Sequence, residues 1–321
     1  MTPTAICAFD IDAQGSARPC DVTLDGLPGQ GWRWLHFDMR APGLDAWLAD
    51  TLPPLVVENL TVEQTRPRVR TLDTGLLLNL RGVNLNDGDA PEDMVALRIW
   101  ATPQLVVTVR RRRIFAVDAL RTQAQSDTGA GTLPATPGGF LDTLIEGLIT
   151  RIEAMSLSLD NMADSFEDRV YEGGAIELPR LAPLQRQIIK LRRHLSPQTK
   201  ALADLARTDS PVIADDLRED LRQSADRAQR TDEELQEVRD RLLSLSQHLE
   251  AARDARLGRN SYVLSVIAAI FLPLGFLTGL FGVNVGGIPG MGNPNGFAWL
   301  CLMTGIVAVF WYLVLRWKRW L

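Results

Sequence analysis

The chain has 321 residues, of which 46% are hydrophobic and 23% charged, and its formal net charge at pH 7 is −5. Three basic residues follow position 315, so residues 1–315 carry a formal net charge of −8. A nucleic-acid-binding protein would instead be expected to present a basic face. The three cysteines form no Cys-x-x-Cys pair and the three histidines are scattered, so we expect neither a disulfide framework nor a structural zinc site.

Residues 1–127 are expected to form one cytoplasmic α+β domain with a mixed or antiparallel sheet. Strands are indicated where β-branched and aromatic residues gather between Gly, Pro, Asp or Asn, and helices where apolar residues recur with helical spacing. The turn Asn86-Asp87-Gly88-Asp89 between two of these strands indicates a loose hairpin. The expected strands are 4–10, 32–37, 68–72, 76–83, 95–100 and 105–109, and the expected helices are 44–51, 55–60 and 114–125.

This part of the chain carries no motif of an enzyme. It contains no Gly-x-Ser-x-Gly, no phosphate-cradling glycine loop and no paired carboxylates with a partner base. The one concentrated charge is the run 110–113, four consecutive arginines after an expected strand. Such a run is more often the solvated end of a sheet than a phosphate site, and we interpret it as a sheet end.

Glycine and proline gather in residues 128–139, which we interpret as a linker. Beyond it a cytoplasmic helical stalk is expected over residues 140–260. Its first helix, 140–171, is acidic and stops at Gly173-Gly174, whereas its second, 179–207, is basic and is expected to bend at Pro197. We expect these two helices to pack antiparallel with complementary charges, and the acidic helix would also raise the local concentration of cations.

A third helix is expected from residue 213, because no proline or glycine interrupts 213–257. Apolar residues recur along it at spacings of 3 and 4, which is the seam of a helix that packs along another helix. Only Gly258 separates this segment from the apolar stretch that follows, so one continuous helix is predicted over 213–281, about 100 Å long. The seam residues are Leu235, Val238, Leu242, Leu245, Leu249 and Ala252.

Residues 260–315 contain no Asp, Glu, Lys, Arg or His. Within them, 262–281 and 297–315 are each long enough to cross a hydrocarbon core of about 30 Å, so we predict a hairpin over 261–321 with two membrane spans and an outer loop, 282–296. No signal peptide is visible at the N-terminus. Basic residues flank the hairpin, and by the positive-inside rule both termini are expected in the cytoplasm. These residues are Arg253, Arg256 and Arg259 before the first span, and Arg316, Lys318 and Arg319 after the second.

The end of the first expected span reads Gly282-Val283-Asn284, followed by Val-Gly-Gly-Ile-Pro-Gly. Together with the second span, the basic tail and the long preceding helix, this turn resembles the CorA superfamily of divalent metal ion transporters, whose signature turn is usually Gly-Met-Asn. The valine and the continuation look most similar to the ZntB-like zinc transporter branch. The resemblance covers residues 140–321 well and the N-terminal part loosely. CorA-type magnesium channels usually carry acidic residues in the outer loop, and 282–296 has none.

The resemblance implies a funnel-shaped homopentamer, multi-pass in the bacterial cell inner membrane, that transports Zn²⁺ and similar ions such as Cd²⁺, Ni²⁺ and Co²⁺ without a cofactor. The implied partners are divalent cations, the lipid bilayer and further copies of the chain. The α+β domain would then serve as a scaffold and metal sensor. An oligomer is also required on physical grounds, because two spans cannot enclose a conduit.

The first span is the more polar of the two, so we expect it to line the pore. The predicted pore-lining residues are spaced three or four apart, so they lie on one face of the helix. The small residues on this face could instead serve only to let helices pack closely. Pro273 frees the carbonyl of Ala269, for which Ser265 or water is the expected partner, and it marks a bend or gate. The predicted pore-lining residues are Ser261, Leu264, Ala268, Leu272 and Gly275.

The signature turn offers neutral oxygens for a cation. The amide of Asn284 and the carbonyls of Gly282 and Val283 would hold an ion through its waters. Tight zinc binding would call for thiolate or imidazole, so the zinc assignment depends on the resemblance. A CorA-type magnesium or cobalt channel is one alternative, and a membrane-anchored coiled-coil sensor is another. The sequence leaves open uptake against efflux, proton coupling and regulatory metal sites.

Overall fold

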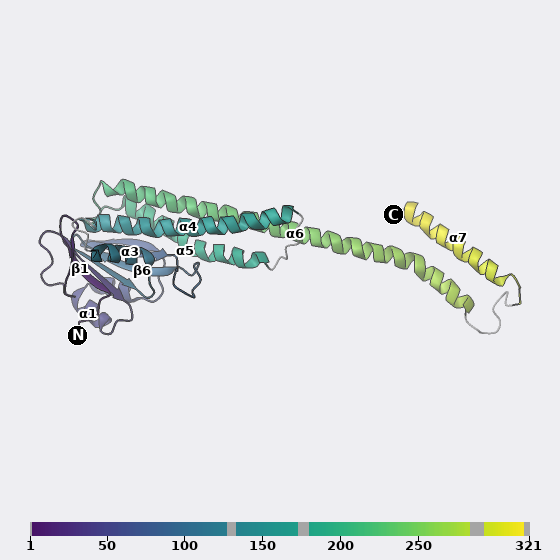
Figure 1. The fold of residues 1–321 in the computed structure, drawn as a ribbon, viewed down its shortest axis with the longest axis horizontal. Helices are drawn as coiled ribbons and strands as arrows, with labels where there is room; N and C mark the ends of the chain where they lie inside the picture. The colour runs from purple at the N-terminus through teal and green to yellow at the C-terminus, as the bar shows by residue number, and fades with distance from the viewer. Residues whose placement is uncertain (1, 127–132, 173–179, 283–291, 318–321) are drawn as a thin grey trace. The chain divides into compact units, whose positions relative to one another are not determined.

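The computed structural model describes residues 2–126, 133–172, 180–282 and 292–317. The chain divides into two compact units, Met1–Leu245 and Ser246–Leu321. The first unit contains a sheet and the helices packed on it, and the second contains two apolar helices (Figure 1). The expected α+β region and most of the expected stalk therefore belong to the same compact unit.

A mixed seven-stranded sheet forms the centre of the first unit, in the order β2-β1-β3-β7-β6-β5-β4. Neighbouring strands are antiparallel except β3 and β7, which are parallel. All six expected strands are present, β1 begins three residues later than expected, and β2 was not expected at all. The strands are β1 (Cys7–Ile11), β2 (Ala17–Pro19), β3 (Trp32–Asp38), β4 (Arg68–Leu72), β5 (Gly75–Gly82), β6 (Val95–Ala101) and β7 (Leu105–Arg110).

One face of this sheet is covered by α1 (Leu44–Thr51) and α2 (Pro54–Thr61). Alternate strand residues point to the same side, so one set of apolar positions in β3, β5, β6 and β7 forms a single buried layer against these helices. The layer consists of Leu35, Phe37, Leu77, Trp100, Leu105, Val107 and Val109 from the sheet, and of Leu44, Leu48, Leu52, Val56 and Leu60 from the helices and the turn between them.

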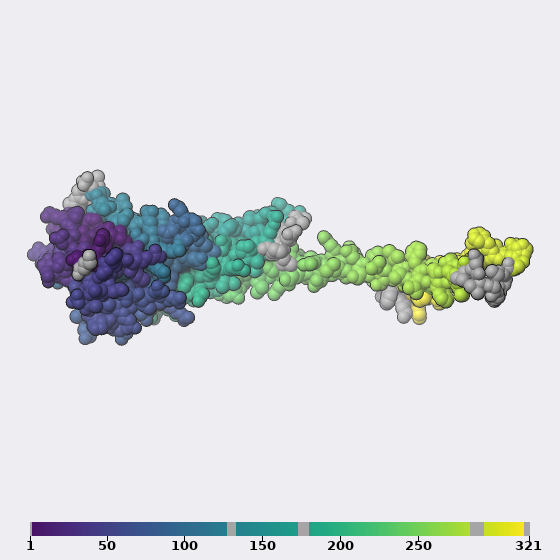
Figure 2. Space-filling view, turned by 90° about the horizontal axis from the view of Figure 1, so that it is seen from below, coloured from purple at the N-terminus to yellow at the C-terminus, as the bar shows by residue number. Residues whose placement is uncertain are grey.

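The opposite face of the sheet packs against the long helix α4 (Pro137–Tyr171). Phe140 of this helix is fully buried, and its ring centroid lies 5.1 Å from that of Trp32 and 4.9 Å from that of Trp34. In Figure 2 the atoms of the strands and of the first unit's helices form one continuous body. α3 (Phe115–Gln125) also contacts α4 and the sheet.

The expected linker is shorter than its composition suggested. Residues 127–132 lie outside the described residues, and α4 already begins at Pro137, capped by the side chain of Thr136, which accepts a hydrogen bond from the Gly139 N–H at 3.1 Å. Gly138 is needed inside this first turn, because a Cβ there would collide with the carbonyl oxygen of Val212. Glycine here serves close packing of the helix against the chain that precedes α6.

α5 (Leu181–Arg207) contains Pro197, and α6 (Leu217–Gly282) is one helix of 66 residues that contains Pro273. The predicted continuous helix is confirmed, but its expected start at residue 213 is wrong. Val212 and Ile213 are 5% and 3% exposed and lie in the connection before the helix, so their apolar character reflects burial rather than helix formation.

The expected charge pairing of α4 with α5 is wrong, because the acidic residues of α4 pair with arginines of α6. Arg227 lies 2.6 Å from Glu153, and Arg241 lies 3.1 Å from both Asp160 and Glu167. No ion pair found among the described residues joins α4 to α5. The heptad register predicts such pairs. Arg241 directly precedes the seam residue Leu242, and Arg227 precedes Ala228, one heptad before Leu235. Interhelical ion pairs form at the positions that flank an apolar seam.

The predicted seam of α6 is buried over its first four positions. Leu235, Val238, Leu242 and Leu245 are each at most 6% exposed. Leu249 is half-buried and Ala252 exposed, and both belong to the second unit. That unit also contains α7 (Gly296–Trp317), which matches the second expected span to within two residues at either end.

Candidate functional site

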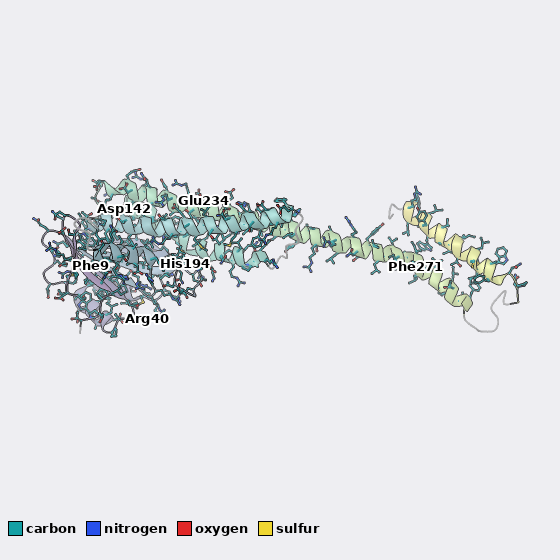
Figure 3. The ribbon with its side chains drawn as sticks, in the orientation of Figure 1. Phe9, Arg40, Asp142, His194, Glu234 and Phe271 are labelled. Atoms are coloured by element: carbon teal, nitrogen blue, oxygen red, sulfur yellow. The ribbon has the colours of Figure 1, made fainter. Side chains whose placement is uncertain are left out.

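The end of α6 and the whole of α7 expose large apolar side chains. Phe271 (Figure 3), Leu272 and Phe297 are 67%, 76% and 79% exposed. In the most apolar 18-residue window, none of α6 and 6% of α7 is buried. The core helix of a soluble protein would show the opposite, so this surface is suited to lipid rather than water. Both helices are long and apolar enough to cross a membrane.

Only one stripe of the α6 span is shielded from solvent. Val266 is 9% exposed, and Ala269, Ile270, Pro273 and Leu277 are partly buried. α7 carries a matching stripe that ends at Leu315, 3% exposed. Because the shielded residues recur every three or four positions, they lie on one face of α6.

The predicted pore-lining residues form the opposite face of α6. At 100° of rotation per residue, their mean direction lies about 160° from that of the shielded stripe. All five are exposed, and no described atom lies within 4 Å of a Cβ built at Gly275. The hairpin thus leaves the predicted face free of its own second helix. The five residues are Ser261, Leu264, Ala268, Leu272 and Gly275.

The hydroxyl groups of Ser265 and Thr278 donate to carbonyls of their own helix. Ser265 donates to the carbonyl of Ser261 at 2.9 Å, and Thr278 donates to the carbonyl of Leu274 at 3.0 Å. Ser265 is therefore not the partner of the Ala269 carbonyl that Pro273 frees, and water is left as the other expected partner. These bonds reduce the cost of placing a hydroxyl in lipid.

The signature turn is described only in part. Gly282 is the last residue of α6 and is exposed, and Val283 and Asn284 lie outside the described residues, as does most of the expected outer loop. Arg253, Arg256 and Arg259 are all exposed on α6, so the basic flank before the first span is available to solvent or lipid head groups.

Within the described residues, no group of three or more His, Cys, Asp or Glu side chains could hold a metal ion. His36 is buried, where Arg110 donates to its Nε2 at 3.1 Å and its Nδ1 lies 2.8 Å from Thr108 Oγ1. Burial, followed by the nearby Arg110, lowers the pKa of His36 to about 3. This histidine is thus a neutral core residue.

The acidic helix α4 does contain one carboxyl group that resists ionisation. Partial burial, together with the neighbouring carboxylates of Asp220 and Glu146, raises the pKa of Asp142 to about 6. His194 on α5, also labelled in Figure 3, shows the complementary effect, because burial lowers its pKa to about 4. Both groups belong to the first unit and titrate below neutral pH.

The arginine run 110–113 lies at the end of β7, as expected, but its side chains are not simply solvated. Arg110 bonds His36, Arg111 lies 3.5 Å from Glu63, and Arg112 pairs with Asp89. Arg113 pairs with the buried Asp118. Sequence reasoning missed these partners because Glu63 and Asp89 stand in loops whose approach to β7 depends on the sheet order.

Comparison with known proteins places this architecture in a family. A family model described as "CorA-like Mg2+ transporter protein" matches residues 29–319. The zinc transport protein ZntB of Yersinia enterocolitica is 34% identical over 324 residues, which cover 99% of this chain and 96% of that protein. The divalent cation transporter CmaX of Pseudomonas aeruginosa is 38% identical over 307 residues, which cover 94% of this chain and 90% of that protein.

Solved structures agree with this assignment. The structure of full-length CmaX matches with a TM-score of 0.84 at 34% identity and covers 99% of this chain and 98% of its own. The CorA magnesium transporter of Methanocaldococcus jannaschii matches with a TM-score of 0.80 over 99% of this chain and 100% of its own, and at 15% identity this likeness concerns the fold alone. The chain therefore belongs to the CorA family and is a divalent-cation transporter with two C-terminal membrane spans, not an enzyme.

Proposed function

We propose that the chain transports zinc and similar divalent cations, such as Cd²⁺, Ni²⁺ and Co²⁺, through a homopentameric pore in a bacterial inner membrane. The observation that carries the proposal is the position of the predicted pore face on α6, opposite the shielded stripe and free of α7. A ring of such faces, one from each subunit, would enclose a conduit that a single hairpin cannot.

The chemistry of this face suits a hydrated ion. It carries no charge, and its small residues leave space for water around the ion. At its outer end, Asn284 amides and the carbonyls of Gly282 and Val283 would contact the hydration shell without replacing it. Such a ring binds weakly, and weak binding allows the ion to leave as well as enter.

Zinc is the favoured cargo because the zinc transport protein ZntB is similar over nearly the whole chain. A second candidate is magnesium, which the description of the matching family model names. Neutral oxygens do not distinguish the two ions, since a tight zinc site would use thiolate or imidazole. Competition between the ions in one assay separates the candidates.

The basic flanks of the hairpin support cytoplasmic N- and C-termini. A membrane potential that is negative inside favours entry of a divalent cation by about 4.6 kcal/mol per 100 mV, twice the value for one charge. Passive flow through the proposed pore is then uptake. Proton-coupled transport would require a titratable side chain in the spans, and residues 260–315 contain no Asp, Glu or His.

The test is zinc flux into liposomes that contain the purified full-length protein. We expect saturable flux that Asn284→Ala reduces by about tenfold, the effect of losing one favourable contact to the ion from every subunit. Asn295→Ala is the matched control, because Asn295 lies beyond the signature turn, and it should leave flux unchanged. Equal flux in both variants would exclude the asparagine ring.

The same liposomes decide the alternatives. Magnesium that passes in preference to zinc would favour the magnesium channel. A variant with residues 283–289 scrambled should lose all flux, whereas retained function would favour a sensor whose hairpin only anchors. If the protein were monomeric in the membrane, the proposal of a homopentameric pore would be wrong.

A further inference from the structure

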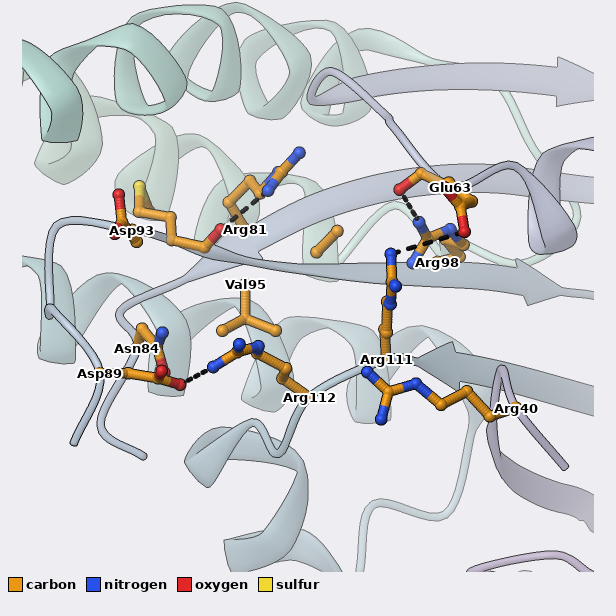
Figure 4. Close-up of a pocket in the computed structure, with 12 residues that line it drawn as sticks. Arg40, Glu63, Arg81, Asn84, Asp89, Asp93, Val95, Arg98, Arg111 and Arg112 are labelled. Atoms are coloured by element: carbon orange, nitrogen blue, oxygen red, sulfur yellow. Dashed lines mark hydrogen bonds and ion pairs between the residues drawn. The ribbon is translucent and has the colours of Figure 1, made fainter. Parts of the chain in front are cut away.

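A pocket of about 450 Å³ opens in the first unit, beside the β5–β6 hairpin. Its wall is built from the loops after β3, α2 and β7 together with β5 and β6. Figure 4 shows Arg40, Arg98 and Arg111 at one side and the Arg112–Asp89 pair at the other. In all, five arginines line it: Arg40, Arg81, Arg98, Arg111 and Arg112.

The strand register brings three of these arginines to one face of the sheet. Arg98 pairs with Asn79 on β5 and with Val109 on β7. Because side chains alternate along a strand, Arg81 and Arg111, each two residues further along, project from the same face as Arg98. Like charges in such diagonal positions repel one another unless nearby opposite charges neutralise them.

The carboxylates that line the pocket form ion pairs with only some of these arginines. Glu63 pairs with Arg111 at 3.5 Å, and Asp89 pairs with Arg112. Asp93 pairs with Lys190 on α5 at 2.9 Å. Among the described residues, no carboxylate forms an ion pair with Arg40, Arg81 or Arg98.

Arg98 is the innermost of the three and is 1% exposed. Its Nε donates to the Val62 carbonyl at 2.9 Å and its Nη2 donates to the Glu63 carbonyl at 2.8 Å, while its Nη1 has no acceptor among the described atoms. The Nε of Arg81 also lacks an acceptor there. Burial, together with the nearby positive charges of Arg81 and Arg111, lowers the pKa of Arg98 to about 10. A buried guanidinium with an open donor and no ion-paired carboxylate is stabilised by an anion.

We propose that this pocket binds an inorganic phosphate anion, a di- or triphosphate in preference to a single phosphate. Several guanidiniums around one cavity match the multiple negative oxygens of such an ion, and guanidinium is the group best suited to hold phosphate. The lining contains no aromatic ring to stack on a base, and its apolar members are only Met94, Val95 and Ala96. The pocket therefore recognises phosphate groups rather than a nucleoside.

The test is calorimetric titration of the full-length protein, in detergent and free of divalent cations, with pyrophosphate at constant ionic strength. The wild type should bind saturably. Arg40→Glu should weaken binding by about tenfold or more, because it replaces one unpaired charge by its opposite. Arg40 is exposed and forms no described ion pair, so this variant should fold. Arg70→Glu, on the exposed edge strand β4, is the matched control and should bind as the wild type does.

Four further outcomes decide the assignment. Failure of the wild type to bind, or equal weakening by Arg70→Glu, would overturn the site. Chloride that displaces pyrophosphate at equal charge concentration would show general attraction of anions and would also overturn it. ATP should bind no tighter than triphosphate, and a clear preference for ATP would contradict a pocket for phosphate groups alone.

Discussion

The side-chain amide of Gln198 on α5 makes both hydrogen bonds of a missing strand partner to the backbone of Arg81 on β5. Its Oε1 accepts from the Arg81 N–H at 2.6 Å and its Nε2 donates to the Arg81 carbonyl at 3.2 Å. The pairing of β4 with β5 ends at Asn79, so this part of β5 would otherwise be an open edge. Gln198 is 1% exposed, and water cannot easily replace it.

Gln198→Leu should therefore destabilise the first unit. The leucine fills a similar volume but leaves a buried N–H and a buried carbonyl without partners, which costs about 1–3 kcal/mol. Hydrogen exchange followed by mass spectrometry should show faster exchange in the peptide that contains β5, with a lower Tm of the purified protein. Gln236→Leu, at an exposed position of α6, is the control and should change neither value.

Arg241 is the second residue whose loss should weaken this unit. Its guanidinium meets three carboxylates of α4, and Arg241→Gln leaves them facing one another. We expect a loss of about 1 kcal/mol at low ionic strength, because the group is partly exposed and solvent screens it. The carboxylates are Asp160, Asp164 and Glu167.

The ionic strength dependence separates this effect from lost packing. In about 1 M salt the screening length falls to about 3 Å, so the difference in Tm between Arg241→Gln and wild type should shrink. Arg239→Gln serves as the control, since the structure describes no ion pair for Arg239. A difference that persists at high salt would assign the stabilisation to the side chain's packing instead.

Thiol labelling tests which face of α6 meets water. In a background without native cysteines, Ala268→Cys lies on the predicted pore face and Ile270→Cys lies on the shielded stripe. A membrane-impermeant, water-soluble reagent should modify Ala268→Cys at least about tenfold faster, because thiolate forms only where water reaches. Zinc in the medium should slow that reaction. Equal rates at both positions would place the pore face elsewhere.

Asp142 should make stability depend on pH. Its pKa of about 6 lies above the unfolded value of 3.8, so the folded protein binds more protons in this window and stability falls as pH rises through it. At pH 8, Asp142→Asn should raise the free energy of unfolding by about 1 kcal/mol, a figure that allows for the partial solvent exposure of the group. At pH 3 it should leave the free energy of unfolding unchanged. Tm measured from pH 3 to pH 8 checks this. Asp226→Asn, at an exposed position of α6, should show no such trend.

Much of the architecture could be predicted because its signals are local. Strand and helix periodicities gave six of the seven strands, and the short β2, Ala17–Pro19, carries too few residues to show an alternation. The five residues predicted to line the pore lie together on one exposed face of α6, since spacing of 3 and 4 defines a face without knowledge of its neighbours. Whether that face lines a pore stays a prediction, and so does the role of Asn284, which lies outside the described residues.

The sequence by itself determined the two membrane spans and the continuous helix before them, because hydrophobicity, charge and helix-breaking residues act along the chain. Only the tertiary structure decided that Arg227 and Arg241 of α6, rather than α5, neutralise α4. It alone brought Arg98 next to Arg40, and Gln198 to the open edge at Arg81. These contacts depend on which elements pack together and in what strand order, and charge and periodicity allow several arrangements that only the buried core distinguishes.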